Sequence, residues 1–436
     1  MRQLNVAIIG GGTVGGGVYD ALRRNGALMA ARMGTRLVVN HVTVRSLAKK
    51  RNVAFDSNLL STDWKAAIKD DSTDIVIELV GGTKTAKKIV EFALKRGKPV
   101  VTANKALLSE HGEALFALAQ EKQTGLYYEA SVAGGIPIIK ALRESLVGNQ
   151  FTEIYGILNG TCNYILTRME DEGGQFEDVL ADAQAKGYAE AEPSLDVDGW
   201  DALHKAGIIA SLAHGFWVEP DSIHVEGIRD ISTLDIRFAA ELGYRIKLLA
   251  TISPAKKKGA PRVQVSVCPT LIPRNHVLAS VAGVFNAVFV HGDVVGETLL
   301  YGRGAGQDAT ASAVLSDIAD AALDLATEES ARISPFSPYA KNGKVIPWGD
   351  VVSEYYMRLE VVDEPGTMAK IANVLAKAKI GISSIRQPEG HGGDVVPLIL
   401  MIHDAKTSAI QKAMNQINRL NVVKSTPRLI RVEHFQ

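Results

Sequence analysis

Residues 4–15 read Leu-Asn-Val-Ala-Ile-Ile-Gly-Gly-Gly-Thr-Val-Gly, a short apolar run that ends in glycines. The last six residues match the pattern GxGxxG, with a strand expected before them and a helix starting near Thr13. In this setting the first glycine permits a tight turn, the second admits a pyrophosphate, and the third lets the helix pack closely on the strand. A glycine-rich turn without a ligand is the alternative. We expect a dinucleotide-binding loop formed by Gly10, Gly12, Thr13, Val14 and Gly15.

Strand-like and helix-like patterns alternate through residues 1–137. Strands are expected at residues 37–44, 75–80 and 99–103, and a helix with one apolar face at residues 86–96. Such alternation is typical of an α/β domain with a Rossmann-type, doubly wound parallel sheet. A glycine-rich stretch at residues 301–306 then opens a long apolar helix at 309–325. We expect this region, about 301–330, to return and pack on the first domain.

The residue after the second predicted strand bears on the choice of dinucleotide. The acid that usually binds the ribose is missing there, and Arg45 follows the strand, with Lys49, Lys50 and Arg51 nearby. An arginine at this place can pair with the 2′-phosphate of NADP. We therefore favour NADP, with NAD still possible; a solvated basic loop is the alternative.

The composition of the chain limits the classes of protein to which it can belong. The chain has 436 residues, of which 46% are hydrophobic and 22% charged, as in soluble globular proteins of two or three domains. Lysine plus arginine equals aspartate plus glutamate, 48 against 48, so charge gives no reason to expect nucleic acid or membrane as a partner. The two cysteines form no disulfide framework, and no signal peptide or long apolar segment is recognisable. We expect a cytoplasmic protein.

Three further regions follow the first domain. Residues 138–300 mix helices (138–146, 202–214) with strands (151–158, 263–267), and we expect an α+β domain for catalysis, substrate binding and dimerisation. Residues 331–352 contain three prolines and are typical of a flexible linker. Residues 353–436 show strand and helix patterns of a compact, separable α+β domain.

Several segments resemble homoserine dehydrogenases, in the order that the family has them. They are Thr-Ala-Asn-Lys at 102–105, Gly-Ile-Leu-Asn-Gly-Thr at 156–161, Gly-Tyr-Ala-Glu-Ala-Glu-Pro at 187–193, and Leu-Asp-Val-Asp-Gly-Trp-Asp-Ala-Leu-His-Lys at 195–205. The resemblance implies a reversible, nicotinamide-linked interconversion of L-homoserine and L-aspartate 4-semialdehyde, in the biosynthesis of threonine, methionine and isoleucine.

The resemblance also implies residue roles. Lys205 would donate and accept the proton, while Glu190, Asp201 and Asp196 would bind homoserine; the Gly-Tyr-x-Glu spacing selects Glu190 over Glu192. The remaining residues would lie on the cofactor side, namely Lys105 (also near the substrate), Gly187, Gly302 and Gly306. A role in a turn is the alternative for each of the three glycines.

The chemistry of this set can be argued from the residues. Asp201 and Lys205 are four residues apart, so on a helix they share one face. Carbonyl reduction needs a hydride donor and a proton source, and a partly buried lysine with a tuned pKa can be that acid, or the base in reverse. We expect carboxylates to bind the ammonium group of the substrate. An ordinary surface ion pair is the alternative.

Residues 129–137, Glu-Ala-Ser-Val-Ala-Gly-Gly-Ile-Pro, resemble the monovalent-cation loop of the same family. The resemblance implies that the backbone carbonyls of Glu129, Val132, Gly134 and Ile136 ligate sodium. Oxygen ligands of this kind suit a hard cation.

Two other functions remain open. An acylating aspartate-semialdehyde dehydrogenase also has a Rossmann domain and needs a nucleophilic cysteine, for which Cys162 is a candidate. A small buried cysteine is the commoner outcome, and the 195–205 segment has no role in that chemistry. The chain could also be an amino-acid sensor on a dinucleotide-fold scaffold, although a scaffold would not need Lys205 and its carboxylates.

The C-terminal domain carries its own resemblance. Asp-Glu-Pro-Gly-Thr-Met at residues 363–368, between a strand and a helix, is similar to the signature of ACT domains, which have a ferredoxin-like α+β fold. The resemblance implies that an amino acid such as threonine binds at this turn and regulates the enzyme, and that the chain forms a homodimer or homotetramer. A structural or oligomerising module is the alternative.

Overall fold

The computed structural model describes residues 1–255, 261–327, 333–388 and 391–435. The N-terminal unit is built on a parallel sheet with the strand order β3-β2-β1-β4-β5-β6. This order confirms the Rossmann-type sheet, and the direction of winding reverses between β1 and β4, where such sheets bind ligands. The strands are β1 (Arg2–Ile9), β2 (Thr35–Thr43), β3 (Leu60–Ser61), β4 (Ile75–Glu78), β5 (Val100–Thr102) and β6 (Leu126–Tyr127).

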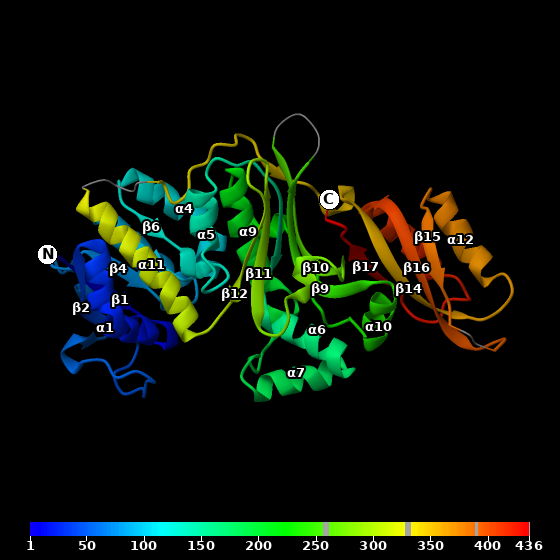
Figure 1. Ribbon diagram of the computed structural model, residues 1–436, viewed down its shortest axis with the longest axis horizontal. Helices are drawn as coiled ribbons and strands as arrows, with labels where there is room; N and C mark the ends of the chain where they lie inside the picture. Colours follow the sequence, from blue (N-terminus) through cyan, green and yellow to red (C-terminus); the bar gives the residue numbers. More distant parts are fainter. Residues whose placement is uncertain (256–260, 328–332, 389–390, 436) are drawn as a thin grey trace.

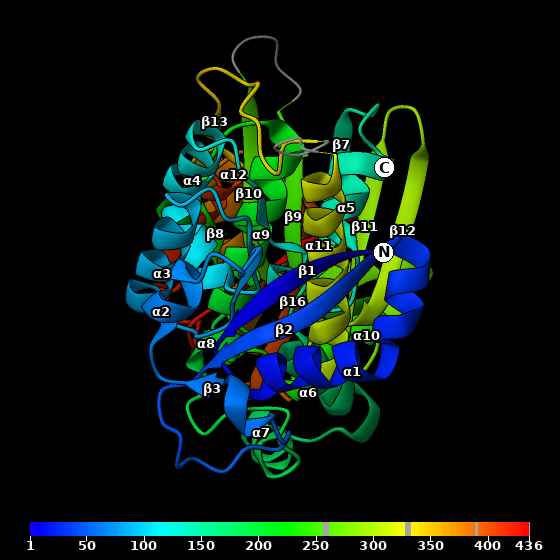
Figure 2. The same ribbon diagram turned by 90° about the vertical axis from the view of Figure 1, so that its left-hand side faces the viewer.

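Helices cover both faces of this sheet because successive residues of its strands point to opposite sides. Ile8 of β1 packs in one core with α1 and α11, whereas Ile9 packs in the other core with α2, α3 and α4. Figure 2 shows the two groups of helices on opposite sides of β1 and β2. The helices are α1 (Thr13–Met33), α2 (Trp64–Lys69), α3 (Lys84–Leu94), α4 (Lys105–Glu121) and α11 (Gln307–Ala326), with the short η1 (Ser57–Leu59).

The return of α11 to the first unit is confirmed. It crosses α1 (Figure 1), and a Cβ at Gly17 would lie 2.6 Å from Cγ of Gln307, so the glycine permits the close contact. Residues 328–330 at the end of the predicted return region, and 331–332 of the predicted linker, lie outside the described residues.

The second unit contains an antiparallel sheet with the order β12-β11-β7-β9-β10. The helix expected at 138–146 is split into α5 (Ile138–Lys140) and the π-helical η3 (Ala141–Ser145), and the strand expected at 263–267 extends to β10 (Arg262–Pro273). The other strands are β7 (Phe151–Ile157), β8 (His224–Val225), β9 (Tyr244–Pro254), β11 (Phe285–Gly292) and β12 (Gly296–Arg303). The helices are η2 (Glu129–Ser131), α6 (Gly160–Glu172), α7 (Phe176–Ala185), α8 (Ser194–Val197), α9 (Trp200–His214), η4 (Pro220–Ser222), α10 (Thr233–Glu241) and η5 (Val277–Ser280).

The C-terminal unit has the element order βαββαβ and the antiparallel strand order β17-β14-β16-β15, which is a ferredoxin-like topology. Apolar residues that alternate along β14, such as Met357, Leu359 and Val361, form its core with α12 and α13. Its elements are β14 (Val352–Val362), α12 (Thr367–Lys377), β15 (Ile382–Arg386), β16 (Val395–Lys406), α13 (Thr407–Ile417) and β17 (Arg428–Val432).

The expectation of a flexible tether before a separable module is wrong. β17 pairs in parallel with β10, so the second and C-terminal units share one continuous sheet (Figure 1). In the segment expected as a linker, the Tyr339 hydroxyl donates to the Ala213 carbonyl at 2.8 Å, and β13 (Lys344–Val345) pairs with β10 before η6 (Trp348–Asp350). Proline-rich composition alone could not reveal these long-range contacts.

Among the described residues, no helix is long and apolar enough to cross a lipid bilayer.

Candidate functional site

The glycine loop lies at the carboxyl end of β1, beside the end of β4. Gly10 has φ 120°, and a Cβ there would collide with the Leu79 carbonyl oxygen, so only glycine suits this turn. A Cβ at Gly15 would collide with the Gly10 carbonyl oxygen, so the third glycine permits close packing of α1 on β1. Gly12 faces open space at the start of α1, next to the N–H groups of Thr13 and Val14. The loop therefore has the turn, the open backbone and the helix N-terminus that a pyrophosphate requires.

Arg45 is exposed two residues beyond the end of β2. Arg51 has a different role in the same loop, because its guanidinium donates to the backbone carbonyls of Ser46, Leu47 and Lys49. Arg45 therefore lies just after β2, as expected from the sequence.

Lys105 and Lys205 both form ion pairs with Asp201 where the first unit contacts the second. Lys105 begins α4 directly after β5, and its Nζ lies 2.6 Å from Oδ1 of Asp201 in the first turn of α9. Lys205, one turn further along α9, places its Nζ 2.7 Å from Oδ2 of the same carboxylate. Asp201 and Lys205 are each only 7% exposed, so this is not the surface ion pair that the spacing alone allowed.

Burial and charge set the protonation of this cluster. Burial lowers the pKa of Lys205 and the positive charge of Lys105 lowers it further, while Asp201 opposes both effects. Burial would raise the pKa of Asp201, but the two ammonium groups outweigh it and hold that pKa well below its usual range. Burial acts to lower the pKa of Lys105, and Asp201 more than offsets it, so that pKa is raised. Of the two lysines, Lys205 is therefore the one whose pKa is lowered.

Asn159 and Asn286 complete the cluster, and sequence reasoning assigned neither. Nδ2 of Asn159 donates to Asp196 at 2.7 Å and to Asp201 at 2.9 Å. The Leu158 carbonyl accepts from Lys205 at 2.7 Å and from Nδ2 of Asn286 at 2.8 Å. Asn159 stood inside a segment already singled out, whereas Asn286 lies on β11 with no local motif to mark it.

The loop after α7 carries the remaining substrate candidate. Gly187 has φ 74° and turns the chain, and the Tyr188 carbonyl accepts the Thr161 hydroxyl at 2.7 Å. Glu190 is exposed, and its charge helps to raise the pKa of Lys105. The Glu192 carboxylate instead accepts the Ser194 hydroxyl. The structure therefore gathers Lys105, Asp196, Asp201 and Lys205 closely, with Glu190 at the rim.

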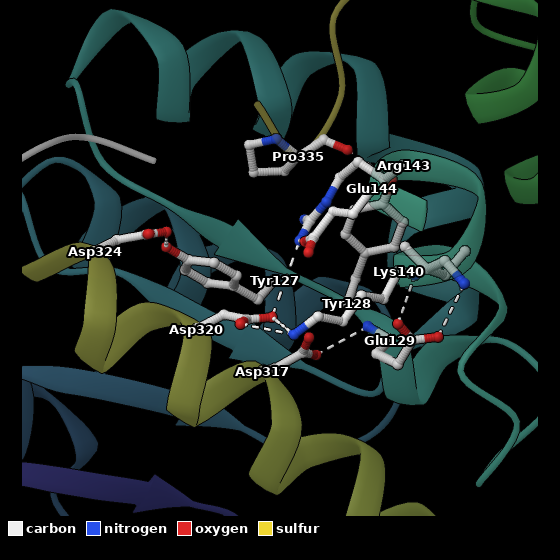
Figure 3. Close-up of polar contacts among 11 residues, drawn as sticks. Tyr127, Tyr128, Glu129, Lys140, Arg143, Glu144, Asp317, Asp320, Asp324 and Pro335 are labelled. Atoms are coloured by element: carbon white, nitrogen blue, oxygen red, sulfur yellow. Dashed lines mark hydrogen bonds and ion pairs between the residues drawn. The ribbon is translucent and has the colours of Figure 1, made fainter. Parts of the chain in front are cut away.

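The segment expected to hold sodium is anchored by a buried polar cluster (Figure 3). The Glu129 carboxylate accepts the N–H groups of Ile139 at 2.9 Å and Lys140 at 2.7 Å, and the Glu129 N–H donates to Asp317 of α11 at 2.8 Å. Nζ of Lys140 donates to both oxygens of Asp320 at 2.8 Å. Burial raises the pKa of Glu129 to about 7. These contacts fix the loop between α5 and α11.

The loop itself is sharply bent and lies against the glycine-rich stretch before α11. Ala133 and Gly134 have φ of 53° and 58°, and a Cβ at Gly134 would lie 2.5 Å from the Gly304 backbone. The Gly135 N–H donates to the Arg303 carbonyl at 3.1 Å. Gly302 borders the predicted sodium loop, because a Cβ there would lie 3.3 Å from Cγ1 of Ile136. Gly306, with φ 119°, is the N-cap residue of α11.

Two of the four predicted sodium carbonyls already accept hydrogen bonds. The Glu129 carbonyl accepts the Val132 N–H at 3.3 Å, and the Ile136 carbonyl accepts the Ile138 N–H at 2.8 Å. A carbonyl oxygen has two lone pairs, so each can still ligate a cation. No cluster of three or more His, Cys, Asp or Glu side chains suited to a metal occurs in the described parts of the chain.

Cys162 does not have the features of a nucleophile. Its side chain is fully buried, its Sγ donates to the Asp196 carbonyl at 3.1 Å, and burial raises the pKa of its thiol well above the usual value. A reactive cysteine needs a depressed pKa and access to substrate. The structure thus weighs against acylating chemistry at this residue.

Comparisons with known proteins agree with this geometry. A family model described as "Homoserine dehydrogenase, NAD binding domain" matches residues 10–129, and one described as "Homoserine dehydrogenase" matches residues 137–319. The chain is 40% identical over 436 residues to a homoserine dehydrogenase of Neisseria gonorrhoeae, covering 99% of each chain. It is also 40% identical over 439 residues to one of Pseudomonas aeruginosa, covering 100% of each.

Solved structures give the same result. The structure of a homoserine dehydrogenase from Thiobacillus denitrificans has a TM-score of 0.94 with 40% identity, covering 100% of this chain and 99% of that one. A hyperthermophilic archaeal homoserine dehydrogenase in complex with NADPH has a TM-score of 0.63 with 28% identity, covering 74% of this chain and 98% of that one.

Proposed function

The chain belongs to the homoserine dehydrogenase family, an oxidoreductase family with an NAD-binding domain, and on that premise we propose how its own residues carry out the reaction. The reaction interconverts L-homoserine and L-aspartate 4-semialdehyde in amino-acid biosynthesis. The observation that carries the mechanism is the Lys105–Asp201–Lys205 cluster at the junction of the first two units, in which Asp201 and Lys205 are buried. It lies where the chain after β5, at the carboxyl edge of the nucleotide-binding sheet, meets α9.

The glycine loop and Arg45 form the cofactor side of the site. A nicotinamide dinucleotide would lie along Gly10, Gly12 and the N-terminus of α1, and supplies or accepts the hydride. The exposed guanidinium of Arg45 favours NADP over NAD because only NADP carries a 2′-phosphate. The NADPH complex of the archaeal relative supports the same preference.

Lys205 is the general acid and base. In the direction of reduction its ammonium group gives a proton to the aldehyde oxygen as a hydride reaches the carbonyl carbon, which yields the alcohol. In the reverse direction the neutral amine takes the hydroxyl proton. Burial and the charge of Lys105 lower the Lys205 pKa, so this amine loses its proton more readily than an exposed lysine does.

The carboxylates hold the substrate and orient Lys205. Asp201 fixes both lysines, and Asn159 ties Asp201 to Asp196. The substrate ammonium group is bound by Asp196 and by Glu190 at the rim, with Asp201 behind them. Because Glu190 is exposed, it can reach a substrate that enters from solvent.

The loop at residues 129–136 is the proposed sodium site, with the carbonyls of Glu129, Val132, Gly134 and Ile136 as ligands. Its positive φ values and its contact with Gly304 support this role, because they hold the backbone in a tight bend. Replacing sodium chloride with choline chloride at equal ionic strength should lower the melting temperature or the activity. Equal melting temperatures and equal activities in the two salts would contradict the proposal of a sodium site.

The C-terminal unit is proposed to be an ACT domain that binds threonine at residues 363–368 and supports a homodimer or homotetramer. Its ferredoxin-like topology supports this, as does Gly366, whose φ of 94° starts α12 at the exposed turn. The two buried free thiols support a reducing, cytoplasmic location.

The direct test is an assay of homoserine oxidation with NAD and NADP, followed by nicotinamide absorbance. We expect turnover with both and higher kcat/KM with NADP. Absence of turnover with either cofactor would support the sensor function instead.

A further inference from the structure

A cavity of about 270 Å³ lies between the C-terminal unit and the second unit. Its wall on the second unit includes Glu226 and Cys268, and its opposite wall comes from η6, α13 and β17. None of its lining residues belongs to the Lys205 cluster or to the turn at residues 363–368. The cavity is smaller than the ~300–1,000 Å³ usual for drug-sized ligands, so it suits a small metabolite.

Two lining side chains have unused hydrogen-bond donors. Nε1 of Trp348 and Nε of Arg428 are both buried and have no acceptor among the described residues. Nη1 of Arg428 is paired at 3.2 Å with Asp230, whose side chain is 79% exposed. A buried donor without an acceptor is unfavourable, so these two groups favour a ligand with an oxygen anion.

Glu226 adds a carboxylate to the lining of the cavity. Glu226 is bonded at 2.7 Å to the ring of His224, and that ring stacks on Trp348 with centroids 3.9 Å apart. Glu226 is the lining residue that can bind a cationic group, while Met414 and Leu429 supply apolar contacts. The cavity thus offers donors for an anion, an acceptor for a cation and apolar surface within one small volume.

We propose that this cavity binds a small α-amino acid, with its carboxylate at Arg428 and Trp348 and its ammonium group at Glu226. The site is formed within a single chain. It is therefore distinct from the proposed ligand position at residues 363–368, and it does not depend on the assignment of an ACT domain.

The cavity wall is packed against the segment that leads into the catalytic helix. The Ile228 N–H donates to the Val197 carbonyl at 2.8 Å, and a Cβ at Gly227 would collide with the same oxygen. A Cβ at Gly199, the residue before α9, would lie 2.8 Å from Cγ2 of Val225. A ligand that moves Glu226 therefore acts on the turn that positions Asp201. It shifts activity if it binds one arrangement of this turn better than another.

The test is isothermal calorimetry of the full-length protein with L-threonine, L-valine and L-methionine, and with propionate as an anion that lacks the ammonium group. We expect one site per chain for at least one amino acid and no binding of propionate. Glu226→Gln and Arg428→Met should each weaken the affinity by about tenfold or more. Gln411→Trp, an exposed position on α13, should block the cavity without removing a charge.

Two controls separate this site from others. Arg237→Met removes an exposed guanidinium from α10 and should leave the affinity unchanged, as should Gly366→Leu at the turn. Thermal melting of each variant checks that it is folded. Absence of heat with every amino acid up to about 10 mM would overturn the proposal. So would binding that persists in Glu226→Gln and Arg428→Met but is lost in Gly366→Leu. Neither outcome affects homoserine oxidation, so the proposed function is tested separately.

Discussion

Nζ of Lys105 in the nucleotide-binding unit lies 2.6 Å from Oδ1 of Asp201 in the second unit. The other oxygen of Asp201 is bound by Lys205, so a single buried carboxylate connects the cofactor side of the site to the proposed proton donor. This arrangement predicts that Lys105 acts on the chemistry through charge as well as through contact.

Lys105→Met should raise the pKa of Lys205, because the positive charge of Lys105 lowers it in the native protein. Homoserine oxidation needs neutral Lys205, so the rising limb of kcat/KM against pH should move to higher pH. The falling limb for aldehyde reduction, which needs protonated Lys205, should move up as well. Lys105→Arg keeps the charge and should restore the native profile. A limb that stays in place or moves to lower pH in Lys105→Met would contradict this coupling.

Arg45→Ala should weaken the binding of NADP more than the binding of NAD, because a guanidinium binds the extra phosphate of NADP by charge-assisted hydrogen bonds. Dissociation constants for both cofactors, measured by fluorescence titration, check this. Arg51→Ala is the matched control, since Arg51 is tied to backbone carbonyls of its own loop. Equal losses for NAD and NADP in Arg45→Ala would show that Arg45 is only a loop charge.

Arg358→Met should destabilise the junction with the C-terminal unit. Arg358 donates to Asp235, which is fully buried and also accepts from the Tyr356 hydroxyl at 3.1 Å. Removing the partner of a buried charge costs about 3–5 kcal/mol. Urea unfolding measures the change, with the exposed Arg419→Met as a control. A loss no larger than in the control would mean that the junction is held by the β10–β17 pairing alone.

Truncation before Ser353 should reduce the response to threonine if residues 363–368 bind it. The truncation also exposes β10 and leaves Asp235 without Arg358, so the shortened protein should be less stable. Gly366→Leu is the cleaner test, because it changes the turn and leaves the junction intact. Inhibition curves for the two variants and the full chain are the measurement. A flat curve for the full chain, with no heat on adding threonine, would make the C-terminal unit an assembly module.

Cys162→Ser should retain most of the dehydrogenase activity. The thiol is buried and protonated, and a serine hydroxyl can donate to the Asp196 carbonyl in its place. No phosphate-dependent acylating activity on aspartate 4-semialdehyde is expected from either protein. Acylating activity that disappears in Cys162→Ser would favour the alternative enzyme.

Local patterns predicted most of the fold. The glycine loop, the alternating strands and the residues 195–205 depend on neighbours in sequence, and Asp201 and Lys205 lie on one helical face as their spacing requires. Strand β15 has no comparable signal, because its exposed residues show no apolar alternation. Asn286 and the pairing of β10 with β17 could not be predicted, because each depends on a partner more than a hundred residues away.

The proposed proton transfer by Lys205 can be tested by the kinetics of a single variant. The rate of NADPH oxidation with L-aspartate 4-semialdehyde should be measured for the native protein and Lys205→Ala, together with NADPH affinity. Lys205→Ala should lower kcat by about a hundredfold or more and keep its NADPH affinity, because the glycine loop lies on another unit. A Lys205→Ala protein that binds NADPH normally and turns over at nearly the native rate would contradict it.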